Sequence, residues 1–192
     1  IILSEVDNFV PIKGTEKEFE IDTLLLSVGL IPENGISEAC GIKMDSKTKG
    51  PIVNESYQTN IDGIFACGNV LHVHDLVDFV TEESRKAGQA VVKYLDQTLD
   101  QSSNYITLQP GKGVSYIVPQ RINQKNLSNS IELFLRVTNE FKDVQFTVTS
   151  NGEVIKSMKK KHLAPAEMEK VKLKIEDFEH IKDQITLSVE AL

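Results

Sequence analysis

The sequence has no tryptophan, only two cysteines and few aromatic residues, which make up 6% of its 192 residues. Cys40 and Cys67 are too few for a disulfide framework, and no CxxC pair is present to form a redox dithiol or a zinc site. So little cysteine is typical of a reducing compartment, and we expect a cytoplasmic location. No apolar run is long enough to cross a bilayer, and nothing resembles a signal peptide.

Excess positive charge is also missing. The 21 lysines and arginines are outnumbered by 28 aspartates and glutamates, which gives a formal net charge of −7. The chain therefore has no general attraction for nucleic acid or an anionic membrane, and we expect neither as a partner. Its 40% hydrophobic and 26% charged residues are typical of a globular protein. The first residue is Ile1 rather than Met, so we expect this chain to be part of a longer one.

The residue pattern changes near residue 100. Before it, short apolar runs lead into an amphipathic helix predicted over residues 75–95, with Asp75 as its N-cap. The runs Leu24 to Val28 and Ile64 to Cys67 are bounded by glycine or proline and are typical of strands buried on both faces. Residues 98–112 are polar and rich in turn formers, and they predict a linker.

The region 113–192 contains short apolar stretches and no obvious long helix. Most of these stretches alternate apolar with polar residues, and the predicted strands cover residues 114–118, 131–137, 144–149, 153–158, 171–175 and 185–189. Asn151-Gly152 is a strong hairpin signal between two of them. We therefore predict an antiparallel β-sandwich of immunoglobulin-like type, although a true Cys…Trp…Cys signature is absent.

Residues 59–77 have the pattern of a site. A short apolar run ends at Gly68, the small polar residue Asn69 follows, and a loop leads to the predicted helix start. Such a connection can offer a side chain to a sugar hydroxyl and backbone N–H groups to an anion. An ordinary strand-loop-helix connection would have the same pattern. His72 and His74 lie in this loop, but no third ligand is suitably spaced, so we predict no metal site and expect local hydrogen bonds or a polar role near a substrate.

Two segments of the first half resemble a known family. Residues 59–69, TNIDGIFACGN, resemble the second FAD signature of the pyridine nucleotide-disulfide oxidoreductase family, and residues 24–34, LLLSVGLIPEN, resemble its other hallmark, where the nucleotide domain returns to the flavin domain. The stretch 68–80 is closer still to the branch associated with anaerobic glycerol-3-phosphate dehydrogenase.

The resemblance implies a partial Rossmann-like α/β fold before the sandwich, an α+β mixture in all. Residues 1–34 would end an NAD(P)-binding domain, and residues 35–97 would close an FAD-binding domain. FAD would be the cofactor and NAD(P)H the co-substrate of the parent enzyme. The residues that the resemblance places at the flavin are Gly68, Asn69, Val70, Asp75, Leu76 and Val77. The catalytic residues are not identified.

The sequence also departs from the family. Asn69 replaces an Asp, so its amide oxygen would accept a ribityl hydrogen bond without a charge. The family's GxGxxG turns are absent. We therefore expect a carboxy-terminal fragment that is inactive alone, with the missing amino-terminal part and a homo-oligomer or sister subunit as partners. The alternative is that the β-sandwich is an interaction module for assembling a flavoenzyme complex.

Overall fold

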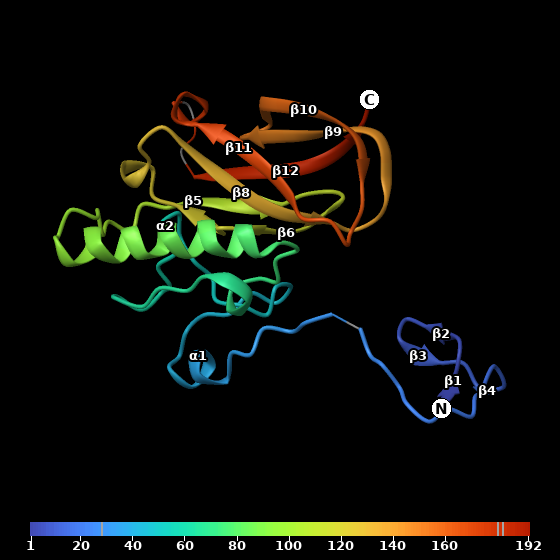
Figure 1. The fold of residues 1–192 in the computed structure, drawn as a ribbon. Coiled ribbons are helices and arrows are strands. Elements are labelled where there is room, and N and C mark those ends of the chain that lie inside the picture. The colour runs from blue at the N-terminus through green and yellow to red at the C-terminus, as the bar shows by residue number, and fades with distance from the viewer. Residues whose placement is uncertain (28, 180, 182) are drawn as a thin grey trace. The chain divides into compact units, whose positions relative to one another are not determined.

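The computed structural model describes residues 1–27, 29–179, 181 and 183–192, and it divides into two compact units, Ile1–Leu30 and Ile31–Leu192 (Figure 1). The first unit contains two antiparallel pairs of short strands, β1 (Ile2–Leu3) with β4 (Lys17–Glu18) and β2 (Val6–Asp7) with β3 (Val10–Pro11).

The buried strand predicted over Leu24 to Val28 is not found. Residues 24–27 belong to no strand, and the side chains of Leu25 and Leu26 are 89% and 70% exposed. Val28 lies outside the described residues. A strand needs a neighbour for its N–H and C=O groups, and no described strand pairs with this segment.

The second unit contains the longer helix and most of the strands. Its helices are α1 (Gly35–Ala39), α2 (Val77–Leu95) and the 3-10 helices η1 (Gly68–Val70), η2 (Gln124–Asn126) and η3 (Ile175–Phe178). Its strands are β5 (Ile106–Pro110), β6 (Val114–Val118), β7 (Arg121–Ile122), β8 (Ser130–Val137), β9 (Phe141–Ser150), β10 (Glu153–Leu163), β11 (Glu169–Lys174) and β12 (Gln184–Ala191). In the described part of the chain, no helix is both long and apolar enough to cross a membrane.

The strands after residue 105 form two sheets. One has the order β10-β9-β12-β5-β7 and the other β11-β8-β6. Each of the six strands predicted in this region is present. Asn151 and Gly152 have φ values of 51° and 83°, as the turn between β9 and β10 requires.

Two expectations about this region are wrong in part. The pair β12–β5 is parallel, so the larger sheet is mixed rather than antiparallel. Strand β5 also falls inside residues 98–112, which were predicted as a linker. Its alternating buried residues Ile106 and Leu108 belong to the core, and the preceding polar residues concealed that pattern.

The main core joins both sheets. Its buried members come from every strand of the two sheets, and they include Leu133 on β8, Phe146 on β9 and Leu187 on β12, each fully enclosed. Burying one such side chain stabilises the fold by about 1.5–3 kcal/mol. The two sheets therefore share one hydrophobic interior.

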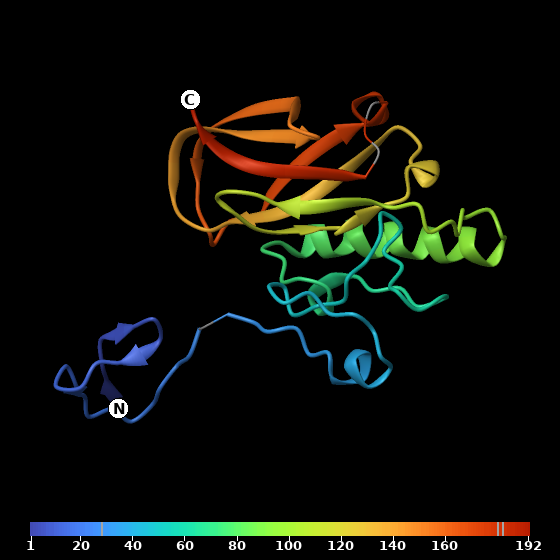
Figure 2. The same cartoon turned by 180° about the vertical axis from the view of Figure 1, so that it is seen from behind.

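Helix α2 lies between the sheets and the loops that precede it (Figures 1 and 2). A second, smaller core joins Ala87 of α2 and Leu71 of the preceding loop to Tyr116 and Val118 of β6. The strand predicted over Ile64 to Cys67 is reduced to a single bridge between Gln58 and Phe65. The helix thus connects the loop carrying the predicted site to the sheet region.

Candidate functional site

The six residues predicted at the flavin lie in one short segment. Gly68, Asn69 and Val70 form η1, Asp75 and Leu76 precede α2, and Val77 is its first residue. Gly68 is buried, whereas the other five are exposed. The exposed side chains leave this segment open to a ligand, and the buried ones between them attach it to the fold.

Gly68 sets the direction of this segment. Its φ of +72° lies in the left-handed region, which glycine adopts without the steric cost of a Cβ atom. Its N–H donates a hydrogen bond of 2.5 Å to Oε1 of Glu83 on α2. Gly68 therefore turns the chain into η1 and fixes that turn to the helix.

Asn69 uses its amide oxygen within the loop. Oδ1 accepts a hydrogen bond of 3.2 Å from the backbone N–H of His74. An amide oxygen has two lone pairs, so this bond leaves Oδ1 able to accept a second hydrogen bond from a ligand. The exposed side chain of Asn69 can therefore meet a ligand as an acceptor through Oδ1 or as a donor through its NH₂.

The N-terminus of α2 has no side-chain cap. The N-cap position is Leu76, which has no group to accept a hydrogen bond from the first turn. Asp75 was predicted in this role, and that prediction is wrong. Its Oδ1 pairs with Arg136 and its Oδ2 accepts a hydrogen bond of 2.6 Å from the N–H of Met168. A charged partner from β8 competes successfully with the helix for this carboxylate.

Arg136 connects the sheet region to the loop before α2. Its guanidinium donates to the hydroxyl of Tyr116 at 3.1 Å, to the carbonyl of Ala166 at 2.5 Å and to the carbonyl of Val73 at 3.2 Å, besides pairing with Asp75. Burial acts to lower the pKa of Arg136, but Asp75 and Tyr116 outweigh it and leave this pKa raised. The cation is therefore permanent, and it neutralises Asp75 beside the positive end of α2.

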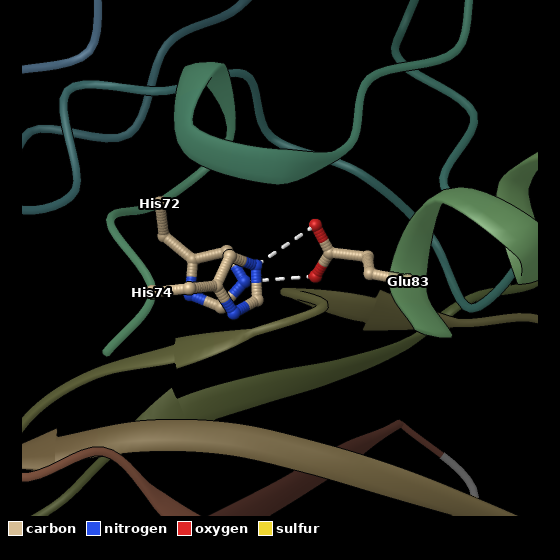
Figure 3. A group of neighbouring side chains, drawn as sticks. All are labelled: His72, His74 and Glu83. Atoms are coloured by element: carbon tan, nitrogen blue, oxygen red, sulfur yellow. Dashed lines mark hydrogen bonds and ion pairs between the residues drawn. The ribbon is translucent and has the colours of Figure 1, made fainter. Parts of the chain in front are cut away.

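Behind the open side, three polar side chains are buried together (Figure 3). Nε2 of His72 lies 2.9 Å from Oε2 of Glu83, and Nε2 of His74 lies 3.1 Å from Oε1. The three side chains are between 0% and 1% exposed. One carboxylate thus faces two imidazoles in an interior without water contact.

The protonation of this group follows from its surroundings. Burial lowers the pKa of His72 more strongly than Glu83 raises it, so this ring is neutral at pH 7. Burial would raise the pKa of Glu83, but the hydrogen bonds from both histidines hold that pKa at about 2. Glu83 is therefore a carboxylate that receives N–H groups on both oxygens.

Aromatic rings surround the two histidines. Their own ring centroids are 4.2 Å apart, and Phe134 of β8 lies 5.6 Å from His72 and 5.7 Å from His74. Within the described residues, Nδ1 of each histidine has no hydrogen-bond partner. Each ring therefore makes its polar side-chain contact through Nε2 toward Glu83.

Glu83 was not predicted as a member of this group. His72 and His74 were expected to have no suitably spaced third ligand, but the structure brings Glu83 to them from the second turn of α2. A signal was present in the sequence, because Glu83 lies three residues after Val80 and four before Ala87, on the apolar stripe of the helix. A carboxylate on a buried stripe needs a partner, and the nearest polar candidates are the two histidines.

Comparison with known proteins supports the family interpretation of the first half. Residues 4–94 match the family model for pyridine nucleotide-disulphide oxidoreductase. The small chain of glutamate synthase [NADPH] from Mycobacterium tuberculosis is 30% identical over 90 residues, which are 45% of this chain and 18% of that protein. Its counterpart from Halomonas elongata is 30% identical over 89 residues, 44% of this chain and 19% of that protein.

The chain therefore spans about a fifth of the length of these curated relatives. No solved structure matches it significantly. The glycerol-3-phosphate branch does not appear among these relatives, so the narrower resemblance is not shown. The matched region ends one residue before the end of α2 and includes the whole segment from Gly68 to Val77. Residues 4–94 are similar in sequence to pyridine nucleotide-disulphide oxidoreductases, a family that uses flavin and NAD(P)H.

Proposed function

We propose that this chain is the carboxy-terminal part of an FAD-dependent, NAD(P)H-linked oxidoreductase and that residues 68–77 contact its flavin. The observation that carries the proposal is the uncapped, exposed N-terminus of α2 inside the region that matches the family. The free N–H groups of a helix's first turn attract a negative charge or a carbonyl oxygen. When bound, the flavin would supply hydride transfer to or from the nicotinamide.

The residues present fit part of such a cofactor. Asn69 offers an exposed amide to a hydroxyl. The carbonyl of Val70 accepts a hydrogen bond of 2.7 Å from Nδ2 of Asn34, so the backbone group that Val70 could offer is its N–H. Leu76 and Val77 expose apolar side chains, 54% and 76% accessible, at the helix start. Asp75 is bound to Arg136 and Met168, so we assign it to positioning this segment rather than to cofactor contact.

A fragment carrying this segment alone would be inactive. The chain covers about a fifth of its curated relatives, and no GxGxxG turn is present in it to hold a dinucleotide's phosphates. We therefore expect the purified 192-residue chain to pass a desalting column without FAD. Stoichiometric flavin eluting with a monomer of this chain would contradict its assignment as part of a larger enzyme.

The decisive variant is Asn69→Ala in the longer parent chain. Removing the amide should cost a ligand hydrogen bond worth about 1–3 kcal/mol, which is about 5-fold to 150-fold in the Kd for FAD. Flavin fluorescence during titration of the apoprotein measures this Kd. Asn69→Asp keeps an acceptor for the N–H of His74 and should retain or strengthen flavin binding.

Asn69→Asp keeps the loop bond to His74, and a second control tests the loss of an exposed amide elsewhere. Asn139→Ala removes an exposed amide from the turn between β8 and β9 and should leave the Kd unchanged. Equal flavin affinity in Asn69→Ala and the unmodified protein, with both folded by circular dichroism, would remove Asn69 from the site.

A second candidate function concerns assembly. The relatives are small chains by name, and β10 is an eleven-residue strand at the edge of the larger sheet. An edge strand has unpaired backbone groups that can pair with another chain. On this proposal, removing residues 98–192 would abolish association of the parent with its partner subunit, which light scattering would detect as a loss of mass.

A further inference from the structure

We propose that His72, His74 and Glu83 form a structural site for one divalent transition-metal ion, with Zn²⁺ the best match to its donors. The two nitrogens and the carboxylate come from different elements, the loop after η1 and the second turn of α2 (Figure 3). The site does not depend on the proposed flavin function, because its three ligand side chains are buried, whereas the side chains offered to a cofactor are exposed.

The ligand atoms converge on one point. One donor atom from each residue lies within 4.8 Å of the others, and the two nitrogen–oxygen distances are 2.9 and 3.1 Å. Zinc holds nitrogen and oxygen ligands at about 2.0–2.2 Å, so neighbouring donors in a tetrahedral shell lie about 3.3–3.6 Å apart. The observed distances are a few tenths of an ångström shorter, so the side chains need to separate only slightly to admit an ion.

The donor set is complete without solvent. Nε2 of each histidine and the two oxygens of Glu83 make four donors when the carboxylate binds through both oxygens. All three side chains are between 0% and 1% exposed, so no position is open to a substrate or to bulk water. Closed four-coordinate sites stabilise a fold, whereas catalytic sites keep an open position. The ion would therefore fasten the loop to α2.

The donor types also select the metal. Two imidazole nitrogens with one carboxylate suit zinc and its neighbours, whereas Ca²⁺ and Mg²⁺ require mostly oxygen ligands. The N–H of Gly68 holds Oε1 at 2.5 Å and orients the carboxylate, as outer hydrogen bonds commonly do for metal ligands. The same bond connects the metal site to the turn that begins η1.

The metal-free and metal-bound states differ in which nitrogen of each histidine ring carries the proton. Without an ion, Nε2 of both histidines must carry the proton, because a carboxylate only accepts hydrogen bonds. With an ion, the lone pair of each Nε2 binds the metal, so the ring proton is carried by Nδ1. The two states therefore differ in which ring nitrogen is protonated, which long-range proton–nitrogen correlation spectra read directly.

The experiment uses the 192-residue chain, stripped with a chelator and then titrated with Zn²⁺. We expect one zinc per chain by elemental analysis, Nδ1–H tautomers at His72 and His74, and a Tm raised by several degrees in excess zinc. Glu83→Gln and His72→Asn should each weaken zinc binding at least about tenfold, since the loss of one ligand leaves an incomplete shell.

Two matched variants control for nonspecific effects. Glu82→Gln changes the adjacent carboxylate, which is exposed and pairs with Lys170, and His162→Asn removes an exposed histidine on β10. Both should bind zinc like the unmodified chain. Less than one zinc per chain at saturation, equal zinc affinity in His72→Asn, or Nε2–H tautomers in the zinc-treated protein would overturn the proposal. The tautomer measurement needs no variant, so it decides even where Glu83→Gln fails to fold.

Discussion

The unit Ile1–Leu30 and the sheet region from Ile106 to Val189 use apolar residues in opposite ways. Phe9, Leu25 and Leu30 are 97%, 89% and 66% exposed, whereas Leu133 and Phe146 are completely enclosed. Both regions are rich in strand-forming residues, so composition does not explain the difference. Each strand of the two sheets pairs with at least one long neighbour or core strand. The described strands of the first unit are two residues long and form two isolated pairs.

The difference shows which part of the chain has its own core. The main core draws its buried members from residues 106–189, whereas the described residues of the first unit, 1–27, 29 and 30, contribute none of the buried hydrophobic residues. Large exposed apolar side chains gathered in one unit mark a surface that another segment or molecule covers, or an association hazard. We therefore expect the isolated chain to self-associate through residues 1–30.

The largest expected effect comes from separating the regions. A piece covering residues 103–192 should unfold in one cooperative transition, since it contains the complete main core. A piece covering residues 1–97 should show none. Thermal unfolding followed by circular dichroism checks both. The 103–192 piece would expose Tyr116 and Val118, which α2 covers in the chain, so its Tm should be lower than that of the whole. Absence of a cooperative transition in the 103–192 piece would show that the core depends on α2.

A matched pair of substitutions tests the same contrast at single residues. Leu133→Ala removes a side chain with 0% exposure and should lower the free energy of unfolding by about 2–5 kcal/mol. Leu25→Ala makes the same chemical change at 89% exposure and should change it by less than about 0.5 kcal/mol. Urea unfolding measures both values. A cost at Leu25 comparable to that at Leu133 would mean that the first unit is buried against something in solution.

The smallest expected change in the free energy of unfolding comes from removing hydrogen bonds and ion pairs. Arg136→Ala removes a guanidinium with 17% side-chain exposure that joins β8 to the loop before α2, and it should lower the free energy of unfolding by about 1–3 kcal/mol. Lys156→Ala removes an ammonium with 27% side-chain exposure that pairs with Asp177, and it should cost less than about 1 kcal/mol. Denaturant unfolding of both variants compares them. Equal costs would show that Arg136 contributes no more than a surface ion pair.

The sheet region was predictable because its signals are local. Alternation over five to ten residues and the Asn151-Gly152 turn place β6 and β8 to β12 within a few residues of their observed bounds. The parallel pair β12–β5 was not predictable in this way, because pairing between strands distant in sequence leaves no mark on either one.

The site was predicted only as a segment. Residues Gly68 to Val77 lie together because they are adjacent in the chain. Their hydrogen-bond partners, in contrast, come from distant parts of the sequence. Asp75 was expected to cap α2, but Arg136 is 61 residues away in sequence and no local pattern announces it. The role of Glu83 was easier to predict than that of Arg136. A carboxylate on the apolar stripe of a helix is visible in the sequence, and its burial requires a polar partner.

The order of strands in the larger sheet has a consequence for biosynthesis. Strand β12 lies between β9 and β5, so the strand translated last of the five occupies the centre. Until β12 leaves the ribosome, β9 and β5 have no common neighbour and the sheet exists only as separate pieces. Closure then depends on contacts between residues far apart in the chain, such as Leu108 and Ile185, which slow folding relative to local pairing. The nascent protein is therefore exposed to misassembly for as long as its final strand is unmade.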